Sequence, residues 1–521
     1  MTPAFNLLDE PWIPVRSLAG EVREVGLLEL FERASQLEGL AETSPPNLVA
    51  LYRVLLAVTH RALTRTLGTW KDADRARWYR DGLPDGALRD YLKYWRDRFW
   101  VFHPEHPFMQ VAALATLPET KDKLKPWTQV ALDRANGNTP SVFDHAVDDA
   151  PTPVRWQALM RDLLGFLQFT PGGLVKSVRA SDKAAALSNT AACIPLGSNL
   201  SRTLCLALHP RTTGEIEDAP TWERSPTTLA ALKSEGRLAS GPNDRYTRLS
   251  RAVLLATEPD GDGLVRHIRF AAGVALIADD NDPDPMASYR VGKAGAVRLT
   301  FQEGRALWRD LPTLVPDPSG RHALPAPVLQ WATNVHLSTN GRESHVPFIV
   351  AGIASDQAKL LRWRADRIVL PAAVLADPDS AQGMRQAVSR AEQTFSSLRG
   401  IATDMLAAAM PDSKHKDTRA RARALLDRSG FAATFFGRAE RSLPLLLQQV
   451  AGGEFDAAER HWSGMLAAAA EESWDGVLAL TGRSPAALRA EARAWPRFRG
   501  FIRRLDNFEP HETTSAEEID A

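Results

Sequence analysis

The sequence predicts an α+β protein: a large, irregular mixed α/β domain over residues 1–370, followed by a C-terminal four-helix bundle over residues 371–510. Up to residue 370, short strand-like apolar runs alternate with helical stretches and long polar segments. Beyond it, alanine, leucine, arginine and glutamate dominate, and apolar residues recur every three or four positions. The acidic end of the chain, residues 511–521, is expected to be disordered.

The first domain begins with a short strand over residues 5–16 that two prolines interrupt, and we expect Trp12 and Ile13 to be buried. Helical periodicity follows over residues 46–66 and 86–99. Later in the domain we expect further strands at residues 198–208, 252–256, 265–277 and 296–301. We also expect Trp308 to lie in the core.

Two histidines and a glutamate stand close together in residues 103–108, so a metal site has to be considered. His103 and His106 are three residues apart, but the interleaved prolines prevent the helical display of an HExxH zinc site. We therefore expect no metal here and interpret the segment as a rigid turn that positions Phe108.

The segment over residues 115–153 is polar and without periodicity, which predicts a long exposed loop. Its apolar tip is followed by an aspartate and a histidine, in the order Val142, Phe143, Asp144 and His145. A solvated loop seldom displays phenylalanine without a partner. The tip either docks onto another molecule or inserts into the core of this one.

A helix predicted over residues 156–169 stops at a Pro-Gly-Gly turn that contains Gly172 and Gly173, and Lys176 and Arg179 follow closely. Glycine backbone can approach another backbone or take a positive φ. The two cations attract phosphate. A nucleic-acid contact loop needs these properties, although an ordinary loop at the end of a helix can have them too.

Residues 348–353 and 367–370 predict the two strands of a hairpin, with a polar turn around Ser355, Asp356 and Gln357. Arginines alternate with apolar residues beside this turn, at positions 362, 364 and 367. Such a hairpin could push a side chain into the groove of a nucleic-acid duplex. An ordinary hairpin with a solvated edge fits the same pattern.

The bundle is predicted from five helical segments, four of them main helices and one peripheral, at residues 387–409, 417–429, 439–451, 456–470 and 484–499. Breaks between them fall at Pro411, Gly430, Gly452-Gly453 and Gly482. Two basic clusters could form grooves that follow a nucleic-acid backbone, although a charge run is usually a solvated face. They comprise Lys414, Lys416, Arg419, Arg421 and Arg423, and Arg493, Arg497, Arg499, Arg503 and Arg504.

Charge and cysteine content limit the kinds of function and the cellular compartment that the sequence predicts. Lysine plus arginine equals aspartate plus glutamate, at 63 each, so a nucleic-acid surface must be local and we expect a subunit that borrows affinity from partners. The two cysteines, Cys193 and Cys205, form no CxxC, which favours a reducing cytoplasm. No signal peptide and no apolar run of about 20 residues is found, so we expect a cytoplasmic protein without a membrane partner.

Motifs of known catalytic chemistry are absent from the sequence, including the P-loop, HExxH, GxGxxG and GxSxG. A Ser/His/Asp hydrolase built from Ser177 or Ser181 with His145 is the remaining enzymatic alternative. The balance favours a binding protein that is not an enzyme and needs no cofactor.

Several of these stretches, in this order, resemble the large subunit of the type I-E CRISPR surveillance complex (Cascade), the CasA family. The resemblance spans nearly the whole chain, and its N-terminal dodecapeptide and its EHPFMQ motif are the most specific parts. The matching stretches are residues 5–16, 105–110, 171–177 and 351–357 and the helical C-terminal third.

In that family the subunit inspects duplex DNA for the short protospacer-adjacent motif (PAM), chiefly from the minor groove. By resemblance, Gly172 and Gly173 look like the family's glycine loop, with Lys176 following. Gln357 looks like the wedge that opens the first base pairs, with Asp356 beside it. A basic finger also takes part, and its position falls on the strand that carries two arginines in place of the family's lysine, Arg266 and Arg269.

The resemblance also implies partners. The segment with Val142, Phe143, Asp144 and His145 looks like the loop that grips the 5′ end of the guide RNA (crRNA) and the neighbouring backbone subunit. In the family the bundle contacts the small subunits and helps to hold the displaced non-target strand, and the complex recruits a separate helicase–nuclease. The cations expected to follow that DNA backbone are Lys414, Lys416, Arg419, Arg497 and Arg499. The cysteine cluster of some relatives is absent, so no zinc is expected.

Two other functions remain open. A purely structural subunit would bridge partners without reading DNA, and it would tolerate bulky residues at Gly172 and Gly173. The hydrolase would show activity in a nuclease and esterase screen.

Overall fold

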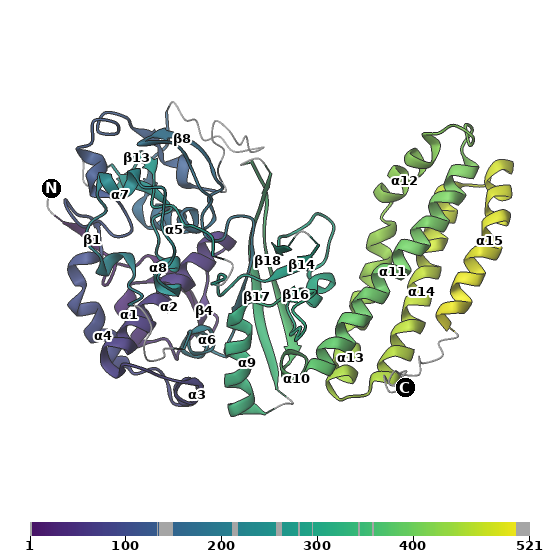
Figure 1. Cartoon of the computed structure of the whole chain (residues 1–521), viewed down its shortest axis with the longest axis horizontal. Coiled ribbons are helices and arrows are strands. Elements are labelled where there is room, and N and C mark those ends of the chain that lie inside the picture. Colours follow the sequence, from purple (N-terminus) through teal and green to yellow (C-terminus); the bar gives the residue numbers. More distant parts are fainter. Residues whose placement is uncertain are drawn as a thin grey trace, which may run out of the picture. The chain divides into compact units, whose positions relative to one another are not determined.

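The computed structural model describes residues 3–132, 134, 150–210, 217–256, 263–279, 282–293, 295–341, 344–356 and 359–506. The chain divides into two compact units. The first comprises Met1–Glu303 and Ser319–Ala372 and mixes helices with strands, whereas the second comprises Gly304–Pro318 and Ala373–Ala521 and is helical (Figure 1). The predicted α+β class is confirmed. In the described part of the chain, no helix has the length and apolar character that crossing a membrane requires.

One long helix, α2 (Pro45–Leu67), runs through the core of the first unit. Every residue from Pro45 to Leu63 is buried, and α2 contacts α4, α5, α6 and α8 as well as two strands described below. A helix that is buried on all sides has no solvent-facing stripe, which is why its charged members must find internal partners. The other helices of the unit are α1 (Leu27–Glu32), α3 (Asp72–Asp81), α4 (Asp85–Tyr94), α5 (Trp156–Phe169), α6 (Leu200–Ala207), α7 (Leu229–Lys233), α8 (Pro242–Tyr246) and α9 (Pro327–Asn340).

The strands form several small antiparallel sheets. Two hairpins carry residues of the predicted nucleic-acid contacts: β8 (Gly173–Ser177) with β9 (Arg179–Asp182), and β17 (His345–Asp356) with β18 (Lys359–Pro371). The sheet orders among described residues are β1-β5, β3-β2-β4, β11-β13-β6, β12-β7, β8-β9, β10-β17-β18 and β15-β14-β16. Their remaining bounds are β1 (Ala4–Asn6), β2 (Ile13–Ser17), β3 (Val22–Val25), β4 (Leu37–Leu40), β5 (Trp100–Phe102), β6 (Lys125–Pro126), β7 (Val154–Arg155), β10 (Ala191–Pro195), β11 (Arg251–Leu255), β12 (Leu264–Val265), β13 (His267–Ala272), β14 (Tyr289–Gly292), β15 (Gly295–Arg298) and β16 (Ala323–Leu324).

The strand predicted over residues 198–208 is wrong, because residues 200–207 form helix α6. The side chain of Asn199 caps this helix by accepting a hydrogen bond from the Arg202 amide at 2.9 Å. Leu200, Leu204 and most of their neighbours are buried, so burial does not follow a single face of this short helix. Such a short apolar run has no period that separates a helix from a strand, and the cap is the signal that decides.

The His103 segment is the predicted turn. The Nδ1 atom of His103 accepts hydrogen bonds from the amides of Glu105 at 3.1 Å and His106 at 2.8 Å, so this imidazole is used by the backbone. Phe108 is 1% exposed, and its ring stacks on Phe99 at a centroid distance of 5.0 Å. Trp12 and Ile13 are buried as expected.

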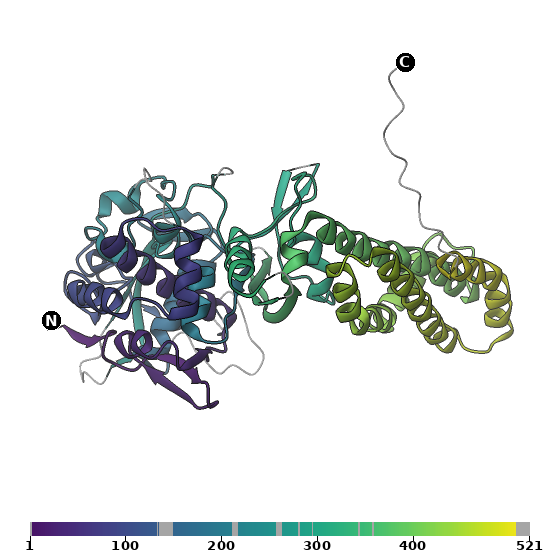
Figure 2. The same ribbon diagram turned by 90° about the horizontal axis from the view of Figure 1, so that it is seen from below.

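The second unit contains four long helices, α11 (Pro378–Ala409), α13 (Phe431–Ala451), α14 (Phe455–Thr481) and α15 (Pro485–Asp506), which run side by side in both views (Figures 1 and 2). The shorter α12 (Thr418–Arg428) lies against α11 and buries only three residues. It is the peripheral segment of the prediction. A further short helix, α10 (Ala372–Ala376), follows β18.

Residues 304–318 pack with the helices of the second unit, although they precede β17 in the chain. The ring of Trp308 lies 6.0 Å from that of Phe436 and 6.1 Å from that of Trp462. Arg309 donates to both carboxylate oxygens of Glu392, at 2.8 and 2.9 Å. The sequence placed these residues in the first domain. The sequence indicates that Trp308 is buried, but it does not indicate whether this side chain packs in the first or the second unit.

Candidate nucleic-acid interface

The glycine hairpin, which we define as residues 170–184, begins where α5 ends. Neither Gly172 nor Gly173 takes a positive φ. A close approach favours glycine at position 172, because a Cβ atom there would lie in a tight contact 3.1 Å from the Ala184 amide nitrogen. At Gly173 an added Cβ would meet nothing within 4 Å. The space that a side chain would take is therefore open at Gly173, whereas at Gly172 it is limited by the backbone of the following strand.

The two hairpin strands are joined under strain. Lys176 and Val178 have φ values of +63° and +67°, in the left-handed region that a β-branched residue rarely adopts. The pairing also shifts between Leu174 and Ser177, which leaves an extra residue on β8. Strained backbone of this kind persists only where the surrounding structure fixes it.

A buried carboxylate, Asp182, fixes the base of the hairpin. One of its oxygens accepts a hydrogen bond from the Gly273 amide at 2.7 Å and lies 3.3 Å from the Arg251 guanidinium. The other accepts from Arg179 at 2.6 Å. Asp182 therefore ties the hairpin to β11 through Arg251 and to the end of β13 through Gly273.

The side chain of Arg251 binds the backbone at both ends of the glycine hairpin. Its guanidinium donates to the carbonyl of Pro171 at 2.7 Å and to that of Lys183 at 2.9 Å. Burial lowers the pKa of Arg251, and the charge of Asp182 opposes that shift. Sequence reasoning missed this residue. The available signal was a charged residue at the start of an otherwise apolar strand, Arg-Ala-Val-Leu-Leu.

The cations of the hairpin fall into two groups. Arg179 donates to the carbonyls of Ser234 and Gly273 and pairs with Asp182, so its guanidinium is used inside the protein. Lys176 is exposed and makes no ion pair among the described residues. Leu174 is also exposed, at 77%. The outward surface of the hairpin thus combines an open backbone at Gly173 with exposed side chains that include Leu174 and two lysines, Lys176 and Lys183.

The predicted finger residues lie close to this hairpin, since β13 contacts both β8 and β9. Arg266 is exposed and donates to the Pro151 carbonyl at 3.0 Å. Arg269 is partly exposed and donates to the Lys121 carbonyl at 3.2 Å. In the part of the chain that the structure describes, each of these two side chains gives one hydrogen bond, to a loop carbonyl.

The second hairpin, β17–β18, is longer than predicted and is plainly visible in Figure 1. Gly352 of β17 passes so close to β10 that a Cβ atom would lie 2.0 Å from the Thr190 carbonyl oxygen. The same Cβ would lie 3.3 Å from the ring of Phe169, which ends α5 just before the glycine hairpin. The β17 strand therefore passes Phe169, next to the start of the glycine hairpin, at a point four residues before its own turn.

Several predicted residues lie outside what the structure describes. Gln357 follows Asp356, the last residue of β17, and falls outside the described residues. The same is true of the whole predicted guide-RNA loop, Val142, Phe143, Asp144 and His145. Of the hydrolase candidates, His145 is not described, and Ser177 and Ser181 lie on the glycine hairpin.

The cations predicted on the bundle are exposed, and three of them are paired. Arg419 of α12 and Arg497 of α15 each contact Asp404 of α11 at 2.9 Å. Arg499 lies 3.3 Å from Glu471. The other two cations, Lys414 and Lys416, are exposed in the turn between α11 and α12.

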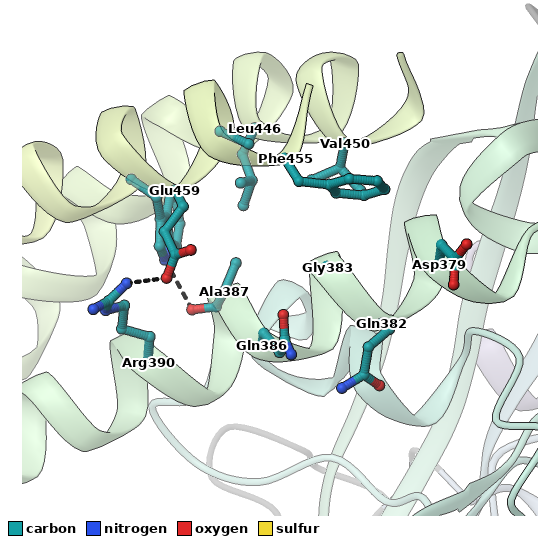
Figure 3. Close-up of a pocket in the computed structure, with 12 residues that line it drawn as sticks. Asp379, Gln382, Gly383, Gln386, Ala387, Arg390, Leu446, Val450, Phe455 and Glu459 are labelled. Carbon is teal, nitrogen blue, oxygen red and sulfur yellow. Dashed lines mark hydrogen bonds and ion pairs between the residues drawn. The ribbon is translucent and has the colours of Figure 1, made fainter. Parts of the chain in front are cut away.

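A cavity of about 380 Å³ lies between α11, α13 and α14 (Figure 3). Trp462 lines it and donates to the Ala387 carbonyl at 2.8 Å. Its charged groups are Asp379 and an ion pair between Arg390 and Glu459. Because carboxylates outnumber cations there, this cavity does not attract phosphate. Among the described residues no group of three or more metal-ligating side chains is found.

Comparison with known proteins identifies relatives along most of the chain. The sequence model of the family described as CRISPR-associated protein Cse1 matches residues 6–473. CRISPR-associated protein CasA/Cse1 of Thermus thermophilus is 36% identical over 410 residues, which cover 77% of this chain and 78% of the relative. A crystal structure of Thermus thermophilus CasA is 30% identical, with a TM-score of 0.81 over 96% of this chain and 99% of that one.

A chain of a solved CRISPR RNA-guided surveillance complex shares the fold at 21% identity, with a TM-score of 0.75. The match covers 95% of this chain and 100% of that one. The family match, the curated relative and the shared fold agree. The chain belongs to the CRISPR-associated protein Cse1 (CasA) family.

Proposed function

We propose that this protein is the non-catalytic DNA-recognition subunit of an RNA-guided CRISPR surveillance complex of the Cascade type. The observation that carries the proposal is the glycine hairpin: its backbone is open at Gly173, Lys176 is exposed beside it, and Asp182 and Arg251 fix its base. Reading DNA through backbone requires a rigid loop without side chains at the point of contact. Family membership supplies the CRISPR context.

The DNA element read is the PAM, approached from the minor groove. The minor groove distinguishes A·T from G·C pairs but carries little further information, so PAM choice should be relaxed. Gly172, Gly173 and Lys176 contact the duplex in this proposal. Arg266, directly before β13, and Arg269 of β13 supply the finger. Both arginines can release their single carbonyl contact for a phosphate or a base edge.

Strand opening is assigned to the second hairpin. Gln357, beside Asp356, enters the duplex as a wedge, and the cost of unstacking a base step is a few kcal/mol. Base pairing with the guide RNA then supplies the sequence specificity and stabilises the opened DNA. Gln357→Ala should therefore impair strand opening more than initial DNA capture. Equal loss of both steps would contradict the wedge assignment.

The partners follow from the same proposal. The loop with Val142, Phe143, Asp144 and His145 contacts the 5′ end of the crRNA and the backbone subunit. The bundle contacts the small subunits and holds the displaced non-target strand, through Lys414, Lys416, Arg419, Arg497 and Arg499. A separate helicase–nuclease is recruited for cleavage. The subunit itself needs no cofactor, and it acts in the cytoplasm.

The decisive experiment compares guide-loaded complexes assembled with and without this chain. Binding to matched duplexes that carry a panel of PAMs is measured at one fixed salt concentration, because phosphate contacts make affinity depend strongly on salt. We expect the chain to tighten binding for some PAMs only. Equal tightening for every duplex would instead identify a structural bridging subunit or non-specific clamp, and the assigned site residues would be wrong.

A further inference from the structure

A second cavity, of about 310 Å³, lies in the first unit and is lined by three arginines together with hydroxyl-bearing and apolar residues. We call it the arginine cavity. The arginines are Arg224, Arg237 and Arg248. Hydroxyl groups come from Ser225, Thr227, Thr228 and Ser234, among others, and apolar surface from Pro226, Leu249 and Val274, among others. Its size is at the lower end of the range for small-ligand sites.

The positive charge of the arginine cavity is only partly balanced. Asp244, with a side chain 1% exposed, contacts all three guanidiniums, at 3.7 Å from Arg224, 3.1 Å from Arg237 and 2.5 Å from Arg248. One carboxylate thus faces three cations. A second buried carboxylate, Asp218, accepts hydrogen bonds from the backbone amides of residues 243 and 244 and makes no ion pair with the three arginines.

Two arginines keep unused donors. Arg237 has a side chain that is 44% exposed, and among the described residues this side chain gives a hydrogen bond only to Asp244. Arg248 is 3% exposed, and its buried Nε atom has no hydrogen-bond partner among the described residues. Burial is the largest cause that lowers the pKa of Arg248. The charge and hydrogen bond of Asp244 oppose this shift, and the charges of Arg237 and Arg224 add to it, so the net pKa lies below its usual value. A cluster of like charges with free donors in a partly apolar site is stabilised by an anion.

The cavity adjoins the glycine hairpin. Ser234, which lines the cavity, receives a hydrogen bond at its carbonyl from Arg179 of β9. Val274, also in the lining, directly follows Gly273, whose amide binds Asp182. Figure 1 draws α7, β13 and β8 in the same part of the first unit. A nucleic-acid strand on the hairpin therefore passes near the cavity.

We propose that the arginine cavity binds a phosphate group, with Arg237 and Arg224 as its accessible ligands and the apolar wall against the attached sugar. The phosphate is a backbone phosphodiester of the duplex that the glycine hairpin holds, or else a free phosphomonoester. The first source rests on the proposed function, and the second does not. Phosphate contacts carry no sequence information, so the cavity positions the duplex without reading it.

The test is the salt dependence of DNA binding by the guide-loaded complex that contains the full chain. Each neutralised phosphate contributes about 0.9 to the slope of log affinity against log salt. Arg237→Ala should reduce that slope by about 0.9 and weaken binding about five- to tenfold near 0.1 M salt. The loss should be equal for all PAMs, and Arg237→Lys should restore most of it. Arg80→Ala, which removes an exposed cation of α3 outside the cavity, is the matched control and should leave the slope unchanged.

A second arm titrates the full chain alone with inorganic phosphate and with adenosine monophosphate, by calorimetry. Binding lost in Arg237→Ala, without any change in the DNA slope, supports the site with a free phosphomonoester as its ligand. A slope change supports the phosphodiester. If Arg237→Ala alters neither measurement, the proposal is overturned. If the wild-type complex shows no PAM dependence, the proposed function fails, and the titration arm still decides the cavity.

Discussion

The glycine hairpin of the first unit and the basic surface of the bundle are both predicted to contact DNA, but they are built differently. At the hairpin, Asp182 and Arg251 are buried, and each satisfies several backbone groups at once. On the bundle, Arg497 and Arg419 share Asp404 in solvent. The first arrangement fixes a backbone conformation, and the second only places charge near a surface.

The comparison shows that a recognition surface and an electrostatic surface make different demands on a fold. A loop that reads shape through its backbone needs strain held by buried partners. A surface that attracts phosphate needs only charge, and exposed ion pairs contribute little to stability, about 0–1 kcal/mol each. Substitutions should therefore have large effects at the hairpin base and small effects on the bundle.

The largest expected effect is that of Arg251→Ala. It removes one of the two cations that contact the buried Asp182, the other being Arg179, and it leaves the Pro171 and Lys183 carbonyls without this donor. The free energy of unfolding should therefore fall by about 3–5 kcal/mol. Denaturant unfolding of the full chain measures this. A decrease of less than about 1 kcal/mol in the free energy of unfolding would mean that the hairpin base is no more sensitive to substitution than the bundle surface.

A glycine pair sharpens the comparison within the hairpin. Gly172→Ala forces the backbone near Ala184 to move, which should cost about 1–3 kcal/mol, whereas Gly173→Ala should change stability by less than about 0.5 kcal/mol. If DNA meets the open backbone, Gly173→Ala should still weaken PAM-dependent binding. Parallel unfolding and DNA-binding measurements separate the two effects. Gly172→Asp should also weaken PAM-dependent binding, because the larger side chain would disturb both the fold of the loop and the surface that meets the DNA.

The ion cluster at Glu392 shows that the second unit also has a constrained region. Burial raises the pKa of Glu392, but hydrogen bonds and charge from Arg309 and Arg305 outweigh it, so the net pKa lies below the usual 4.5. A depressed folded-state pKa contributes stability above the unfolded value, and that stability is lost as pH falls through the folded value. Between about pH 5 and pH 3, wild-type protein should therefore lose more stability than Glu392→Gln. Equal losses would exclude this cluster as an acid-sensitive contact.

The smallest stability effect is expected at Arg497. Arg497→Ala should change the free energy of unfolding by less than about 1 kcal/mol, because its pair with Asp404 is exposed. Asp404→Asn releases both Arg497 and Arg419 from their carboxylate, so the affinity of the complex for DNA should rise at low salt. If the bundle does not contact the displaced strand, Asp404→Asn will leave DNA affinity unchanged.

The sequence predicted the parts of the molecule that local pattern determines. The helix over residues 156–169 and the glycine breaks of the bundle carry their own signals, and the structure has α5 over that range and positive φ at Gly430, Gly453 and Gly482. What it could not predict depends on tertiary contacts. The role of Arg251 needs Asp182, which lies 69 residues away and looks like a loop aspartate in the sequence. The helix at residues 200–207 was missed because it is short, and the apolar spacing of so short a run does not separate a helix from a strand.

The path of residues 304–318 has a practical consequence for dissecting the protein. The chain passes between the two units at residues 303/304, 318/319 and 372/373, so a single protease cut after Ala372 would leave the fragments held together by Trp308 and Arg309. A bundle expressed from Ala373 alone would lack this segment and expose the rings of Phe436 and Trp462 to water. It should aggregate in solution, and co-expression with a peptide spanning residues 304–318 should rescue its solubility.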